Sequence, residues 1–126
     1  MENTYKNLIV WQRAVELVIA IYELTFHFPN SEQYGLTSQI RRAAVSMPSN
    51  IAEGKTRRTG KDFRHFLTMA FASGAELETQ LIIAKRLGFA KPELYLKADT
   101  LLNEVMKMLN VLLQKTSGVL AASSSI

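Results

Sequence analysis

The chain has 126 residues, which is enough for one domain with its own hydrophobic core. It contains no cysteine, so disulfides and thiolate metal sites are excluded and a cytoplasmic location is compatible with the composition. The formal net charge is +4, the first six residues lack the features of a signal peptide, and the apolar run 17–22 is far too short to span a membrane.

The first predicted helix covers about residues 8–28 and carries two adjacent apolar seams. Both seams follow the three- and four-residue spacing of a helix face. One seam consists of Leu8, Trp11, Val15, Val18, Tyr22 and Thr25, and the other of Val10, Ala14, Leu17, Ile21, Leu24 and Phe28. Pro29 ends the helix, because a residue that precedes proline avoids the α region.

A second helix is predicted over about residues 36–57, with a proline inside it. Its core stripe is Leu36, Ile40, Ala44, Met47, Ile51 and Gly54. Pro48 removes one amide donor and crowds the carbonyl group of Ala44, so a kink or a split helix is expected there. Asn50 is expected to satisfy backbone groups that the kink frees.

Capping signals delimit the third and fourth helices. Thr59 and Asp62 resemble a capping box, so the third helix is expected to extend from there to about Leu87, with Gly88 as its C-terminal cap. Pro92 suits the first turn of the fourth helix. The fourth helix again has two seams, one of Leu94, Ala98, Leu101, Val105, Met108 and Leu112, and one of Tyr95, Leu102, Met106, Leu109 and Leu113.

Four helices joined by short loops predict an all-α fold, an antiparallel up-down four-helix bundle over residues 1–115. The uncharged tail 116–126 is rich in serine and alanine and is expected to be flexible. The doubled seams indicate either wide core stripes or a second seam that faces a neighbouring subunit. We favour a homo-oligomer, because exposing Ile9, Ile21, Tyr95, Met106 and Leu113 together would create a larger apolar patch than monomers usually tolerate.

The positive charge is concentrated between Gln39 and His65. Seven basic and two acidic residues give this segment a net charge of +5 (7 − 2), so the rest of the chain sums to −1 (4 − 5). This concentration favours an anionic partner such as RNA or DNA. The candidate nucleic-acid-binding residues are Arg41, Arg42, Lys55, Arg57, Arg58, Lys61 and Arg64. Because exposed aromatic residues are not interleaved with them, stacking on single strands is not predicted.

No constellation of residues favours catalysis, so the protein is not expected to be an enzyme or to need a cofactor or a metal. The sequence has no HExxH, Walker or GxGxxG motif, and its two histidines have no metal-ligand spacing. The polar residues Asn50, Glu53, Ser73 and Glu76 are candidates for a structural network. In that network Glu76 would pair with Arg41 or Arg42, and Glu53 would pair with Arg57 at i,i+4.

Seven segments, in order over about residues 5–115, together resemble the 23S rRNA-intervening-sequence protein family. They are residues 8–14, 28–36, 39–46, 50–54 with Arg57, 66–67, 76–77 and 84–88. The sequence departs from the family pattern at Met47, where isoleucine is usual, and at Phe71-Ala72, where Leu-Gly is common.

The resemblance implies a small bacterial four-helix bundle that assembles into a ring-shaped homopentamer. Some members are encoded inside sequences that interrupt the large ribosomal RNA gene, and most have no established biochemical function. A related branch is the accessory protein of diversity-generating retroelements, in which a basic pentamer binds reverse transcriptase and nucleic acid. Two functions are therefore expected: nucleic-acid binding or, as the alternative, a scaffold that docks an acidic protein partner.

Overall fold

The computed structural model describes residues 4–124, and side chains up to Thr116. This part of the chain is all-helical, with four α-helices and no strand, which confirms the coarse fold prediction. The α-helices are α1 (Ile9–Thr25), α2 (Leu36–Lys55), α3 (Gly60–Arg86) and α4 (Leu96–Ser124). Short 3-10 helices precede α1, α2 and α4, at Tyr5–Asn7, Asn30–Glu32 and Pro92–Tyr95. Within residues 4–124, no helix combines the length and apolar character needed to cross a membrane.

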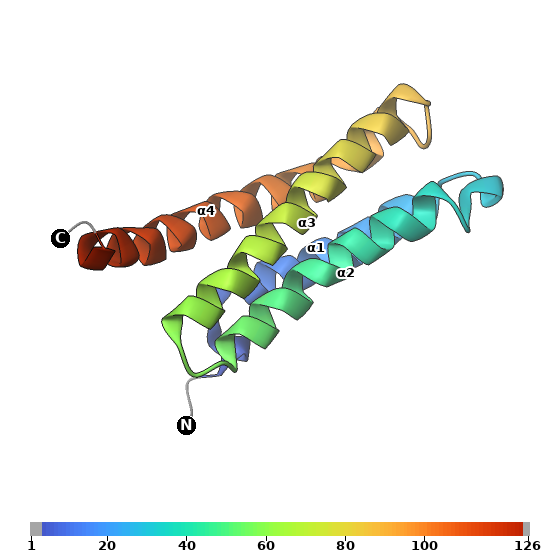
Figure 1. The fold of residues 1–126 in the computed structure, drawn as a ribbon. Coiled ribbons are helices and arrows are strands. Elements are labelled where there is room, and N and C mark those ends of the chain that lie inside the picture. The colour runs from blue at the N-terminus through green and yellow to red at the C-terminus, as the bar shows by residue number, and fades with distance from the viewer. Residues whose placement is uncertain (1–3, 125–126) are drawn as a thin grey trace.

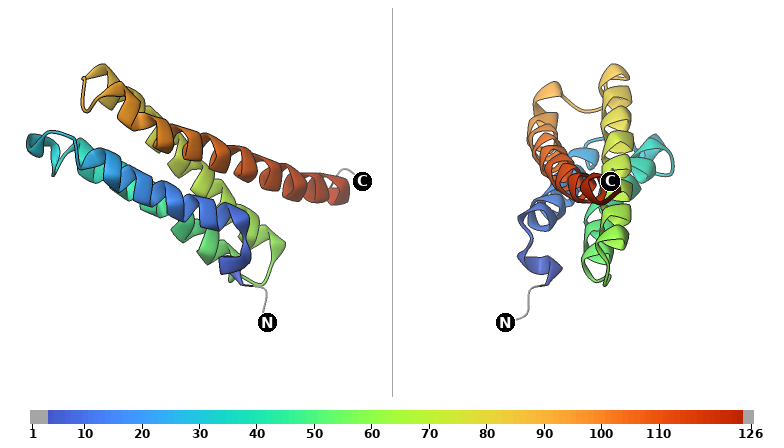
Figure 2. Two further views of the ribbon diagram at one scale, coloured as in Figure 1. Left: turned by 180° about the vertical axis from the view of Figure 1, so that it is seen from behind. Right: turned by 60° about the vertical axis from the view of Figure 1, so that its left-hand side comes forward.

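The helices enclose one hydrophobic core. Both α1 and α3 pack against α2 on one side and against α4 on the other. In Figure 1 the loops that follow α1 and α3 lie at the right, and the loop between α2 and α3 lies at the lower left. The last turns of α4 extend beyond the other helices (Figure 2). Helix α4 thus continues past residue 115, while the side chains after Thr116 lie outside the described residues and the flexibility of the tail remains a prediction.

The two seams of α1 differ in burial. The seam that contains Leu17 and Leu24 is buried along its whole length, whereas the seam that contains Trp11 is only partly buried. Ile21 is fully buried and Tyr95 is only 1% exposed. The prediction that a single bundle would expose these two residues is therefore wrong. A wide core stripe accounts for them, because a helix between two neighbours buries a broad face.

Helix α2 is continuous through Pro48, so the split-helix alternative is excluded. Asn50 Nδ2 donates to the carbonyl oxygen of Ser46 at 2.9 Å. The carbonyl that loses its amide partner to the proline is that of Ala44, so this hydrogen bond does not compensate for Pro48 in the predicted way.

Both ends of α3 form as the capping signals predict. Thr59 Oγ1 accepts a hydrogen bond from the Asp62 amide at 3.1 Å. At the other end Gly88 has a φ of 76°, which glycine adopts without steric cost. The amides of Gly88 and Phe89 donate to the carbonyl groups of Lys85 and Ala84, which is the Schellman arrangement. At the next helix the prediction was less accurate, because Pro92 begins a 3-10 helix and α4 starts only at Leu96.

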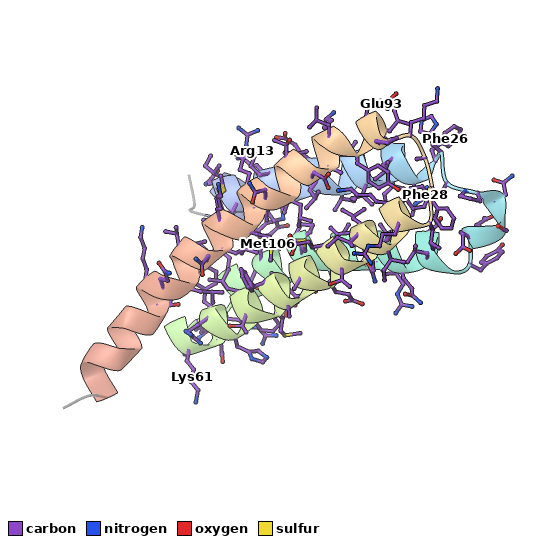
Figure 3. All side chains as sticks on the ribbon, turned by 90° about the horizontal axis from the view of Figure 1, so that it is seen from above. Arg13, Phe26, Phe28, Lys61, Glu93 and Met106 are labelled. Atoms are coloured by element: carbon purple, nitrogen blue, oxygen red, sulfur yellow. The ribbon has the colours of Figure 1, made fainter. Side chains whose placement is uncertain are left out.

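At Gly74 of α3, side chains from α2 and α4 pack against the helix backbone. A Cβ atom at Gly74 would collide with Met106 Sδ of α4 and would lie 2.9 Å from Met47 Cε of α2. Figure 3 shows the Met106 side chain between the helices. The missing side chain therefore makes room for two methionine tips.

Tyr95 gives the fold a sensitivity to alkaline pH. Its hydroxyl donates to the carbonyl oxygen of Phe89, and burial, helped by the negative charge of Asp99, raises the pKa of Tyr95 to about 12. An unfolded tyrosine ionises near pH 10. Protonated Tyr95 therefore stabilises the folded state fully below pH 10, and this stabilisation is lost as the pH rises from about 10 to about 12.

We expect Tyr95→Phe to cost about 1 kcal/mol at pH 7, because the Phe89 carbonyl loses its donor. Above pH 10 the wild-type protein should lose stability more steeply than the variant. Urea unfolding of both proteins between pH 7 and 12 measures the difference, and parallel curves would contradict a buried, protonated Tyr95.

Candidate nucleic-acid interface

The seven predicted basic residues fall into two groups on the structure. The helix cluster consists of Arg41 and Arg42 in the first half of α2. The loop cluster lies at the end of α2, in the following loop and in the first turns of α3, and consists of Lys55, Arg57, Arg58, Lys61 and Arg64. A helix rises 1.5 Å per residue, so Arg42 and Lys55 are about 20 Å apart along α2. The structure therefore does not bring all seven residues into one site.

Three members of the loop cluster are exposed, namely Arg57, Arg58 and Lys61. Lys61 points away from the bundle at the start of α3 (Figure 3). Arg64 is half-buried, and its Nε is buried without a hydrogen-bond partner among the described residues. This side chain is therefore less accessible than the three exposed residues.

Aromatic rings and one ion pair contact two members of the loop cluster, Lys55 and Arg57. The Arg57 guanidinium lies 4.8 Å from the centroid of the Phe66 ring, and Lys55 Nζ lies 5.9 Å from that of Phe63. Arg57 Nη2 also contacts Glu53 Oε2 at 2.7 Å, so the predicted i,i+4 pair is present. Both partners are about half exposed, so the pair contributes only a few tenths of a kcal/mol.

The helix cluster contacts α1. Arg41 Nε donates to Thr25 Oγ1 at 2.8 Å, and the guanidinium lies 4.3 Å from the centroid of the Tyr22 ring. Arg41 therefore bonds to α1 and not to Glu76. Arg42 is exposed, and within the described residues it has no ion pair, although it lines a small pocket together with Glu76.

The four candidate network residues separate into three sets of contacts. Asn50 Nδ2 donates to Ser46 Oγ at 2.9 Å, and Ser46 Oγ lies 2.8 Å from Ser73 Oγ, so Asn50 and Ser73 are linked through Ser46. Glu76 accepts a long hydrogen bond of 3.4 Å from Gln80, and Glu53 pairs with Arg57. Ser46 is the connecting residue that was missing from the predicted set, and its i,i+4 spacing to Asn50 is the signal that points to it.

Two tyrosines lie beside the helix cluster. Their position there was not predicted from the sequence. Tyr34 is 92% exposed and Tyr22 is 43% exposed, and both line one groove with Arg41 and Arg42. These two rings are not interleaved with the basic residues in the sequence, but the fold places them beside Arg41 and Arg42. The fold brings these residues together from α1, from the loop before α2 and from α2 itself, so their separation along the chain hides the arrangement.

Comparison with known proteins assigns the chain to a family. None of the curated proteins compared with the chain matches it. The profile of the 23S rRNA-intervening sequence protein family matches residues 6–111. The matched range includes α1, α2, α3, about half of α4, both basic clusters and the groove with the two tyrosines. The chain therefore belongs to the 23S rRNA-intervening sequence protein family.

Proposed function

We propose that the protein is a non-enzymatic, cytoplasmic nucleic-acid-binding protein. It works as a homo-oligomer of antiparallel up-down bundles, and the resemblance described above favours a pentameric ring. Nucleic acid binds through the basic residues of α2 and of the start of α3. The single observation that carries this proposal is the loop cluster, in which Arg57, Arg58 and Lys61 are exposed together at one end of the molecule.

The physical basis is charge. Exposed arginine and lysine side chains bind phosphates and release counterions, which gives affinity with little dependence on sequence. Each subunit offers only a few such residues, so a single copy is expected to bind weakly. Repetition of the loop cluster in an oligomer raises the overall affinity without any new contact.

The test is binding of the nuclease-treated protein to an RNA hairpin and to duplex DNA at about 50 to 200 mM salt. We expect the affinity to fall by orders of magnitude over this range if several phosphates are contacted. Electrophoretic mobility shifts measure it directly. No binding at the lowest salt concentration would contradict the proposal.

A second candidate function is a scaffold for an acidic protein partner, such as a reverse transcriptase. The charge of the loop cluster favours it, because an acidic protein surface complements exposed basic residues as nucleic acid does. An apolar groove between α1 and α4, lined by Leu8, Ile9, Met108 and Val111 among others, favours the homo-oligomer. In the proposed homo-oligomer a second copy of the chain covers this groove. If the protein binds no nucleic acid at low salt, the scaffold becomes the favoured function, with the loop cluster as its acid-binding surface.

A further inference from the structure

The groove beside the helix cluster has the chemistry of a nucleotide-binding surface. It is open, has a volume of about 600 Å³ and lies between α1, the loop before α2 and the first half of α2. The side chains that matter here are Tyr22, Gln33, Tyr34, Ser38, Arg41 and Arg42. They supply two guanidinium groups, two phenol rings and small polar groups, and no carboxylate lines the groove.

Contacts with α1 hold the Arg41 side chain in one orientation. Its Nε donates to Thr25 Oγ1 and its guanidinium stacks on Tyr22, so α1 holds the side chain in place. Within the described residues neither Nη group has a hydrogen bond or an ion pair, which leaves these donors for a ligand. Arg42 follows on the same helix and is exposed. Two guanidinium groups, one of them already ordered, suit a phosphate.

Tyr34 adds a feature that charge alone does not explain. Its side chain is 92% exposed, and within the described residues its ring contacts no other ring and no cation. A free ring beside phosphate-binding groups is a stacking platform for a nucleobase. The neighbouring acid Glu32 does not line the groove, and its Oε1 accepts a hydrogen bond from the Leu36 amide at the start of α2.

We propose that this groove binds single-stranded nucleic acid, with a base stacked on Tyr34 and the adjoining phosphate bound by Arg41 and Arg42. This inference rests on the proposed function and specifies its ligand. A duplex keeps its bases stacked inside and offers the groove only phosphates, whereas a single strand offers both groups. An acidic protein segment would satisfy the arginines and leave Tyr34 without a partner.

The experiment compares fluorescently labelled oligouridine with an RNA hairpin that carries the same number of phosphates. Kd values are measured for the wild-type protein, Tyr34→Ala, Tyr34→Phe and Phe26→Ala. Phe26 is the matched control, because it is 80% exposed and does not line the groove. Tyr34→Ala should weaken oligouridine binding about tenfold, since stacking of one base contributes roughly 1 to 3 kcal/mol. Hairpin binding should change less than about twofold, and Tyr34→Phe and Phe26→Ala should bind both RNAs like the wild type.

The possible failures can be told apart. If Tyr34→Ala binds oligouridine as tightly as the wild type, the stacking site is wrong, while hairpin binding still supports the proposed function. If the wild-type protein binds neither RNA, the proposed function and this inference both fail. If poly-glutamate displaces oligouridine as well as unlabelled oligouridine does, the groove recognises charge alone, which overturns the inference in favour of an acidic protein. Tyr34 is almost fully exposed, so equal melting temperatures should show that the variant is folded.

Discussion

Replacing Arg57, Arg58 and Lys61 together by glutamate is expected to weaken hairpin RNA binding by at least about a hundredfold at 50 mM salt. The three side chains are the exposed members of the loop cluster, and their reversal changes the charge of one end of the molecule by −6 per subunit. Each lost phosphate contact should also reduce the salt dependence by about 0.9 in the slope of log K against log salt. The same mobility-shift assay measures both quantities.

A control with the same change in charge separates the loop cluster from net charge. Arg86, Lys91 and Lys115 are exposed basic residues outside both basic clusters, and their replacement by glutamate also changes the charge by −6. This second variant should keep most of the binding. Equal losses in the two variants would show that binding follows net charge and would contradict an interface at the loop cluster. Reversal of Arg57 also removes the partner of Glu53, which should cost about 0.5 kcal/mol or less in stability.

Gly54→Ala is expected to destabilise the fold by about 1 to 2 kcal/mol. A Cβ atom at this position would lie 2.8 Å from Phe66 Cβ and 3.2 Å from Phe63 Cδ1, both on α3. A Cβ atom moves only with its backbone, so Phe66 cannot rotate away and α2 and α3 must separate. Overpacking of this kind typically costs 1 to 3 kcal/mol, and the better helix propensity of alanine offsets part of that. Urea unfolding provides the measurement.

Gly60→Ala is the matched control, because Gly60 also lies in a helix but a Cβ atom there would meet nothing within 4 Å. It should leave stability unchanged or raise it by up to about 1 kcal/mol. If the two variants were equally stable, the close approach of α2 and α3 at Gly54 would be wrong. The contact matters for function because it brings the end of α2 to the start of α3 and so places Arg57 over Phe66.

Local signals in the sequence predicted the helices well. Thr59 and Gly88 cap α3, so its ends could be predicted closely from residues that act within one turn. The start of α4 was predicted too early, because Pro92 suits the first turn of a 3-10 helix as well as that of an α-helix. Doubled apolar seams are also ambiguous. The spacing of apolar residues is the same whether a helix packs against two helices of its own bundle or against one in another subunit. Only the packed structure shows that Ile21 is buried.

The candidate site was less predictable than the fold. The loop cluster lies within a short stretch of sequence, so its charges could be recognised together from the sequence. The groove could not, because Tyr22 becomes a neighbour of Arg41 only when α1 packs against α2, and the path of the loop before α2 places Tyr34 beside them. The predicted pairing of Glu76 with Arg41 failed for the same reason. Arg41 forms a hydrogen bond to a threonine hydroxyl on α1 instead of an ion pair with an acid on α3.

The space at Gly74 affects how the bundle responds to strain. Two thioether tips, those of Met47 and Met106, fill this space instead of branched aliphatic groups. An unbranched side chain with three rotatable bonds can follow a small displacement of its surroundings and still fill the volume. When a subunit or a ligand presses on an outer face of α4, these two side chains can rotate and the core keeps its density. The contact between α3 and α4 at Gly74 is therefore filled by side chains that can adapt to a small displacement of either helix.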